Sequence, residues 1–266
     1  MTNPFARAAL LAAGISAFIF VPARNLAAQH AETGAEIHIL CSNGFHAAME
    51  KLLPQAERAS GRAVKVEFGA SANFKRSIEN GDAFDLAILT PQIVADLVKE
   101  GKIAPGTVVD LASTGTGLAV RAGRPKPDVS TAAAIKKTLL DAKSISYVKV
   151  GAGTPAIVDM LNRLGISEDV QRKAVFQPGA ELSMASLAAG ETDVAFALIS
   201  EILASPGVQL AGPLPPEFQR KVIMTAGISA STKDRAAMNA IVQSLTSASA
   251  APTIKAAGMD PIGAGK

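Results

Sequence analysis

The chain has 266 residues, of which 48% are hydrophobic and 18% are charged, so its composition is that of a folded protein and not of a disordered one. It contains no tryptophan and one tyrosine, and its formal net charge is +3, which argues against an aromatic or basic nucleic-acid surface. Its length allows one large domain or two lobes of about 100–150 residues each.

The N-terminal segment has the pattern of a secretory signal peptide. A basic residue precedes an almost unbroken apolar run at 8–21, and the small residues Ala27 and Ala28 follow it. The run is shorter than the ~20 residues of a membrane-spanning helix. We therefore predict a signal peptide at residues 1–28. Since Cys41 is the only cysteine and lies well past the apolar run, neither a disulfide nor a lipid anchor is expected.

After this leader, short apolar runs alternate with helical patterns. We expect strands at 36–41, 63–68 and 85–89, each followed by an amphipathic helix. Pro91 suits the first turn of the third helix, and Gly101 suits its end. This order predicts a parallel sheet with helices on both faces.

A second set of elements follows residues 116–123. The pattern predicts helices at 131–140, from about 154, and around 181–190, with strands at 144–148, 173–176, 193–198 and 221–229. The chain then ends in helices.

Two crossings, near 118–121 and 221–228, would join two α/β lobes. We predict that lobe 1 consists of residues 35–117 and 222–266, and that lobe 2 consists of residues 118–221.

Four strand-to-helix junctions are built from small residues. Ligands of open parallel sheets bind beyond the carboxyl ends of the strands, where helix starts offer unpaired N–H groups and a partial positive charge. Any one junction could equally be an ordinary helix cap. Together they predict a cleft that holds a compact anion with neutral donors. The four junctions are "CSNG" at 41–44, "GAS" at 69–71, "GAGT" at 151–154 and "PGAE" at 178–181.

Five segments of the chain resemble the periplasmic molybdate-binding proteins of ABC importers and their relatives. They are "ILCSNGFHAAMEKLLPQAERASG", "VKVEFGASANFKRSIENGDAFDLAILTPQIVADLVKEGKI", "GLAVRAGRPKPDVSTAAAIKKTLL", "LAAGETDVAFALISEIL" and "GVQLAGPLPPEFQ". The resemblance implies a type II periplasmic binding protein fold, with two α/β lobes and a ligand cleft between them. It also implies a periplasmic monomer that binds a small anion, with an ABC permease of the inner membrane as candidate partner.

The resemblance also implies a set of ligand contacts from serine hydroxyls and backbone N–H groups. The residues at those positions and beside them are Ser42, Asn43, Ser71, Gly153, Thr154 and Ala180. Leu198 stands where the molybdate binders have a tyrosine, and it cannot donate a hydrogen bond. Pro155 removes one amide of the third junction.

Aconitate isomerase is built on the same scaffold, so the alternative function is isomerisation of a small polycarboxylate. That reaction needs a positioned base and cationic groups for the carboxylates. His46 and Cys41 are the candidate bases, and the candidate cations are Lys75, Arg76 and Arg121. As ordinary structural residues, His46 would be a surface side chain and Cys41 a small buried hydrophobe. A third alternative is a binding protein that serves a sensor in place of a permease.

Neither a cofactor nor a metal is expected. Gly151, Gly153 and Ala156 have the spacing of a dinucleotide fingerprint. The next strand ends at Gln177, however, where the fingerprint requires an acidic residue. The chain's three histidines have no metal-ligand spacing with carboxylates or with the cysteine.

Overall fold

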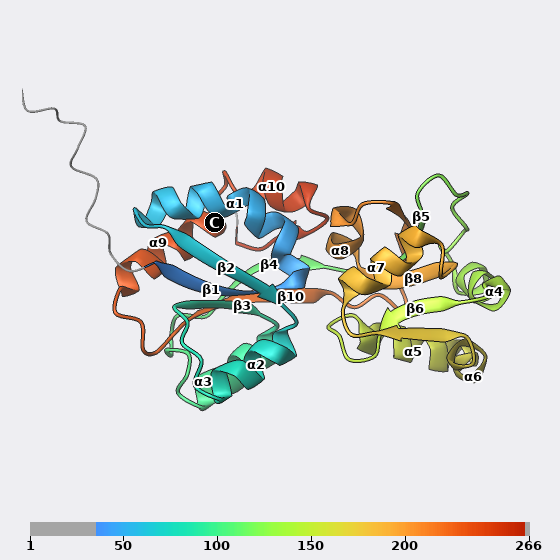
Figure 1. Cartoon of the computed structure of the whole chain (residues 1–266), viewed down its shortest axis with the longest axis horizontal. Helices are drawn as coiled ribbons and strands as arrows, with labels where there is room; N and C mark the ends of the chain where they lie inside the picture. Colours follow the sequence, from blue (N-terminus) through green and yellow to red (C-terminus); the bar gives the residue numbers. More distant parts are fainter. Residues whose placement is uncertain (1–35, 264–266) are drawn as a thin grey trace, which may run out of the picture. The chain divides into compact units, whose positions relative to one another are not determined.

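The structure, a computed structural model, describes residues 36–263, which form two β-sheets with helices packed on them (Figure 1). The predicted signal peptide lies outside the described residues. The first sheet has the strand order β11-β4-β10-β3-β1-β2, and the second has the order β7-β6-β8-β5-β9. Over residues 36–263, no helix is both long and apolar enough to span a bilayer.

The first sheet contains strands from both ends of the described chain. Its strands are β1 (Ile37–Ser42), β2 (Val64–Gly69), β3 (Leu86–Leu89), β4 (Val109–Thr114), β10 (Val222–Ile228) and β11 (Asp260–Pro261). A 3-10 turn, η2 (Asn43–Phe45), follows β1. The accompanying helices are α1 (His46–Ser60), α2 (Ser71–Glu79), α3 (Pro91–Lys99), α9 (Arg235–Leu245) and α10 (Ala251–Ala256).

The second sheet is built from the middle of the chain. Its strands are β5 (Thr116–Arg121), β6 (Ile145–Val148), β7 (Ala174–Gln177), β8 (Val194–Leu198) and β9 (Val208–Pro213). The helices that accompany it are α4 (Ala132–Asp141), α5 (Thr154–Leu164), α6 (Ser167–Gln171), α7 (Ala180–Ala189) and α8 (Ile199–Ala204).

Each sheet carries helices on both faces, as predicted. Along β1, Ile37, Ile39 and Cys41 face the core formed with α1, α9 and α10, whereas Leu40 faces the core formed with α2 and α3. Alternation between two cores explains why the strand is apolar at nearly every position. In the second sheet, α4, α5 and α6 cover one face and α7 covers the other.

The predicted parallel arrangement is confirmed for the first three strands, and each sheet also contains an antiparallel strand whose direction the pattern did not predict. β1 runs parallel to β2 and β3, but β10 is antiparallel to its neighbours β3 and β4. In the second sheet, β5 is likewise antiparallel to β8 and β9. β5 follows β4 directly through Gly115, but the two strands belong to different sheets and do not pair.

The strands change sheet at Gly115 and again between Pro213 and Val222. The lobe boundaries expected at 117/118 and 221/222 lie close to these points and stay a prediction. Strands β4, β5, β9 and β11 were not predicted. The sequences of β4 and β9, VDLAST and VQLAGP, are neither alternating nor continuously apolar.

Candidate functional site

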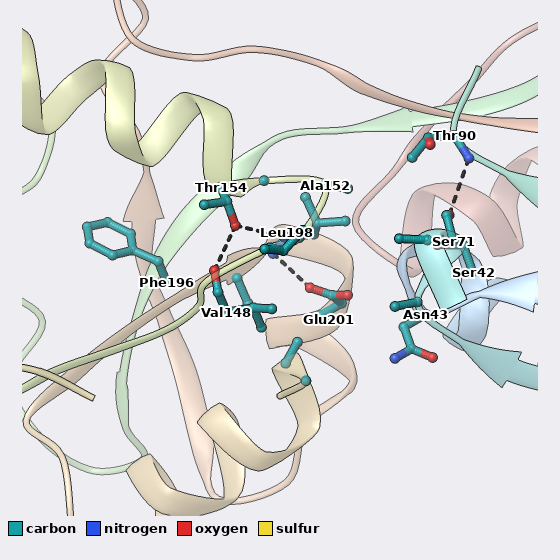
Figure 2. A pocket seen from close by; sticks show the side chains of 18 of the residues that line it. Ser42, Asn43, Ser71, Thr90, Val148, Ala152, Thr154, Phe196, Leu198 and Glu201 are labelled. Atoms are coloured by element: carbon teal, nitrogen blue, oxygen red, sulfur yellow. Dashed lines mark hydrogen bonds between the residues drawn. The ribbon is translucent and has the colours of Figure 1, made fainter. Parts of the chain in front are cut away.

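A cavity of about 240 Å³ is lined by strand ends and helix starts from both sheets (Figure 2). All four junctions of small residues contribute to it. The expected contacts that line it are Ser42, Asn43, Ser71, Gly153, Thr154, Ala180 and Leu198. Their placement is established by the fold, and their role in binding stays a prediction.

The two serines of the first sheet are buried beside this cavity. Ser42 ends β1 and Ser71 is the first residue of α2. The side chain of Ser42 makes no capping hydrogen bond to the turn that follows, so an ordinary cap does not explain this residue. The hydroxyl of Ser71 accepts a hydrogen bond from the backbone N–H of Thr90 over 3.3 Å, and its own proton stays available to a ligand (Figure 2).

The third junction, at 151–154, presents backbone groups to the cavity, because its one polar side chain is already engaged within the loop. Thr154 Oγ1 donates to the carbonyl of Val148 over 2.7 Å and accepts from the N–H of Gly151 over 3.0 Å, so this hydroxyl holds the loop together. A Cβ atom on Gly153 would lie 2.8 Å from Thr116 Oγ1, which explains the glycine at this close approach. The N–H groups of Thr154 and Ala156 already donate to the carbonyls of Gly151 and Gly153, and Pro155 has none, so the loop N–H groups of Ala152 and Gly153 are the donors that this junction can present.

The fourth junction places Gly179 before α7 and Ala180 at its first position. Both residues line the cavity. The helix has ten residues, and its first N–H groups lack partners within the helix. Helix starts from α2, α5 and α7 thus meet at one cavity and favour negative charge there.

The far wall of the cavity is apolar at Leu198 and acidic at Glu201. Leu198 is 3% exposed, and its N–H donates to Glu201 Oε2 over 3.0 Å. Burial raises the pKa of the Glu201 carboxyl to about 7, and the nearby charge of Glu181 acts in the same direction. Sequence reasoning missed Glu201. The available signal was a glutamate at the third position of a helix, where its side chain reaches back to the residue before the helix.

No cationic side chain lines this cavity among the residues that the structure describes. Its polar side chains are Ser42, Asn43, Ser71, Thr90, Thr154 and Glu201. An anion here would be held by neutral donors and helix starts. Within residues 36–263 no group of three or more histidine, cysteine or acidic side chains is placed to hold a metal.

The expected cationic contacts lie elsewhere. Arg121 is exposed at the end of β5, whereas the other end of that strand, Thr116, pairs with Leu198 beside the cavity. Lys75 forms ion pairs with Glu79 and with Glu100, the latter over 2.8 Å. Arg76 donates to the side chain of Asn73. None of the three cations lines the cavity. Only the start of α2 reaches it, and β5 directs toward it the end opposite Arg121.

The two candidate bases also lie outside this cavity. His46 stacks on Phe68 with ring centroids 3.7 Å apart, and its Nε2 lies 3.1 Å from Glu50 Oε1. It lines a neighbouring cavity of about 280 Å³, which shares Asn43, Ala180 and Glu201 with the first. Cys41 is fully buried in the core of the first sheet, and burial raises the pKa of its thiol well above the usual range. Such a thiol is a packing group and a poor nucleophile.

Comparison with known proteins places this geometry in context. The family described as bacterial extracellular solute-binding protein matches residues 37–260. Aconitate isomerase of a Pseudomonas species is 29% identical over 244 residues, which cover 89% of this chain and 91% of that protein. The molybdate-binding protein ModA of Azotobacter vinelandii is 28% identical, with 86% of this chain and 91% of that protein covered.

Among solved structures, the periplasmic molybdate-binding protein of Azotobacter vinelandii superposes with a TM-score of 0.69. The two are 20% identical, and the match covers 84% of this chain and 98% of that one. This likeness concerns the fold alone. It confirms the expected fold class, a type II periplasmic binding protein fold of the α/β class.

Proposed function

Since this chain belongs to the bacterial extracellular solute-binding protein family, we propose that it binds a small carboxylate in the cavity beside Leu198 and delivers it to an ABC permease. The single observation that carries the choice of ligand is the apolar wall formed by Leu198. A bare tetrahedral oxyanion has oxygens on every side, and an oxygen facing a leucine would lose its hydrogen bond.

An organic acid suits the same walls better. Its carboxylate can accept from Ser42, Ser71 and the helix starts, while its carbon atoms contact Leu198 and Val148. The cavity of about 240 Å³ lies just below the usual range of about 300–1,000 Å³ for small-molecule sites, so the expected ligand is small.

The proposed location is the periplasm. The apolar run at residues 8–21 after a basic N-terminus supports export, and the matching binding protein of Azotobacter vinelandii is described as periplasmic. An ABC permease of the inner membrane is the proposed partner, by analogy with the molybdate binders.

The second candidate function is isomerisation of a small polycarboxylate, which the relative named aconitate isomerase favours. The structure changes which residue would carry the proton in such a reaction. Among the described residues, Glu201 is the one acid or base that lines the main cavity, whereas His46 and Cys41 do not line it. A carboxyl with a pKa of about 7 is suited to proton transfer at neutral pH.

A thermal-shift screen of the mature protein tests the proposed function. The panel contains molybdate, tungstate, sulfate, and di- and tricarboxylates including trans-aconitate, at matched ionic strength. A ligand at 100 times its Kd stabilises the folded state by about 2.7 kcal/mol, which corresponds to a Tm increase of about 5–10 °C for a chain of this size. We expect such an increase with a carboxylate. A response to molybdate alone, or to no anion, would contradict the proposal.

The same samples separate binding from turnover. Incubation with trans-aconitate followed by chromatography reports any cis–trans conversion. Conversion that is lost in Glu201→Gln and kept in Cys41→Ala would establish the isomerase, whereas stabilisation without conversion supports the binding protein.

A further inference from the structure

Glu201 is an acidic residue in a cavity that otherwise suits an anion. It lies on α8 three residues after Leu198, and Figure 2 shows its carboxyl in the space between Leu198 and Asn43. One oxygen, Oε2, accepts the N–H of Leu198 over 3.0 Å. This bond fixes the carboxyl in place and leaves Oε1 for a ligand.

Among the residues that the structure describes, no lysine or arginine lines either of the cavities that Glu201 lines. Glu181 on α7 and Glu50 on α1 line the neighbouring cavity together with Glu201, and the His46 beside them is already paired with Glu50. The other elements that pack on α8 are β5, β8, β9 and η2, and they place no charged side chain on either cavity. Arg121, at the far end of β5, lines neither.

An ionised Glu201 would therefore repel any anion bound in the main cavity. Two like charges in a partly buried site cannot both persist without a counter-charge, so one of them takes up a proton. The raised pKa of Glu201, about 7, means that the carboxyl carries this proton in weakly acidic solution and in about half of the molecules at pH 7. A protonated carboxyl is a hydrogen-bond donor, and bonds to charged acceptors are about twice as strong as neutral ones.

We propose that the protonated carboxyl of Glu201 donates a hydrogen bond to the bound carboxylate, so that the protein binds its ligand together with one proton. This inference rests on the proposed function and extends it, because it makes Glu201 a ligand-binding residue and makes affinity dependent on pH. If Glu201 acted only as a helix cap for α8, affinity would not depend on its proton.

The expected pH dependence follows from linkage. A bound anion raises the pKa of Glu201 further, so the complex keeps its proton when the free protein has lost it. Affinity is then constant below about pH 7, the pKa of the free protein, and falls about tenfold for each pH unit above it. Between about pH 6 and pH 9 the expected loss is about 100-fold.

Calorimetric titration with trans-aconitate, and with molybdate in parallel, tests this inference across that pH range. The carboxyl groups of trans-aconitate, with ordinary pKa values near 4, stay ionised throughout. Glu201→Gln keeps an oxygen for the N–H of Leu198 and an N–H for the ligand, but it does not titrate. It should bind about 2- to 10-fold more weakly than wild type at about pH 6 and at least about 10-fold more tightly at about pH 9.

Two matched variants complete the test. Glu181→Gln removes the neighbouring charge that helps to raise the pKa of Glu201, so its affinity should begin to fall at a lower pH than in wild type. Glu168→Gln, on α6 and away from both cavities, should give the wild-type profile.

The outcomes distinguish this inference from the proposed function. Saturable binding whose affinity is the same at every pH would overturn the role of Glu201 and leave the proposed function standing. A Glu201→Gln variant that kept the wild-type pH dependence would overturn it as well. No saturable binding of either anion at any pH would overturn the proposed function and this inference together.

Discussion

The hydroxyl of Ser200, on α8, donates to the backbone carbonyl of Gly44, in η2, over 2.8 Å. Both residues are buried, and they lie 156 positions apart in the chain. The bond joins the two segments that carry Glu201 and Asn43, so it holds two walls of the main cavity together.

Ser200→Ala should lower both stability and ligand affinity. The substitution leaves the buried carbonyl of Gly44 without its partner, which costs about 1–3 kcal/mol of unfolding free energy. Urea denaturation measures this loss. Ser60→Ala is the control, because the hydroxyl of Ser60 bonds only to carbonyls within a few residues of itself. Equal effects of the two substitutions would show that the long-range bond contributes nothing of its own.

Gly153→Ala should destabilise the protein, although its backbone φ of −83° is open to any residue. The new methyl group would lie 2.8 Å from Thr116 Oγ1 and 3.2 Å from Leu198 Cδ2, and overpacking of this kind costs about 1–3 kcal/mol. At Gly179, before α7, the nearest atom to a new Cβ is 3.8 Å away. Gly179→Ala should therefore unfold like wild type in the same denaturation series, and a greater loss at Gly179 than at Gly153 would refute the packing argument.

Cys41 should resist alkylation in the native protein. Its side chain is fully buried and the pKa of its thiol is raised by burial, so the reactive thiolate is scarce at neutral pH. Mass spectrometry after iodoacetamide treatment should find no label on native protein and full labelling in guanidinium chloride. Rapid labelling of the native protein would restore Cys41 as a candidate catalytic residue.

The ligand-free protein should become less stable as pH rises through the titration range of Glu201. Its carboxyl has a pKa of 4.5 when unfolded and about 7 when folded, so between these values the folded state binds more protons than the unfolded state. This contribution to stability is complete below about pH 4.5 and is lost by about pH 7, with a total of about 3 kcal/mol.

Urea denaturation at about pH 5 and pH 8 measures this change. Glu201→Gln should lack this component of the pH dependence, because glutamine does not titrate. Identical pH profiles for wild type and variant would mean that the pKa of Glu201 is ordinary.

The local patterns of the sequence predicted most elements, because both sheets contain strands whose neighbours are linked by helices. β10 and β5 could not be oriented in this way, since each connects to the other sheet and pairs only with distant strands. Apolar periodicity describes a strand and its faces, and it contains no information on the direction of a partner.

The sequence predicted the strand-to-helix junctions of the site but not its acidic residue. Junctions such as Ser42-Asn43 and Gly153-Thr154 have a local signature, and the fold brings them to one cavity. Glu201 has the signature of a helix cap, and only its burial beside the ligand cavity distinguishes it from many other caps. Arg121 was expected at the site because of its charge, but the antiparallel direction of β5 places it at the opposite end of the strand.

The central claim is that a small carboxylate binds at the junctions of Ser42 and Ser71, and calorimetric titration at about pH 6 tests it most directly. The ligand is the carboxylate that raises Tm most in the screen, and it is titrated into wild type and into the Ser42→Ala, Ser71→Ala double variant. We predict one site per chain, and a loss of about 3–6 kcal/mol in the double variant, since each lost hydroxyl bond to a charged carboxylate oxygen costs about 1.5–3 kcal/mol. Molybdate should bind wild type more weakly than this carboxylate. Unchanged affinity in the double variant, or tighter binding of molybdate, would contradict the claim.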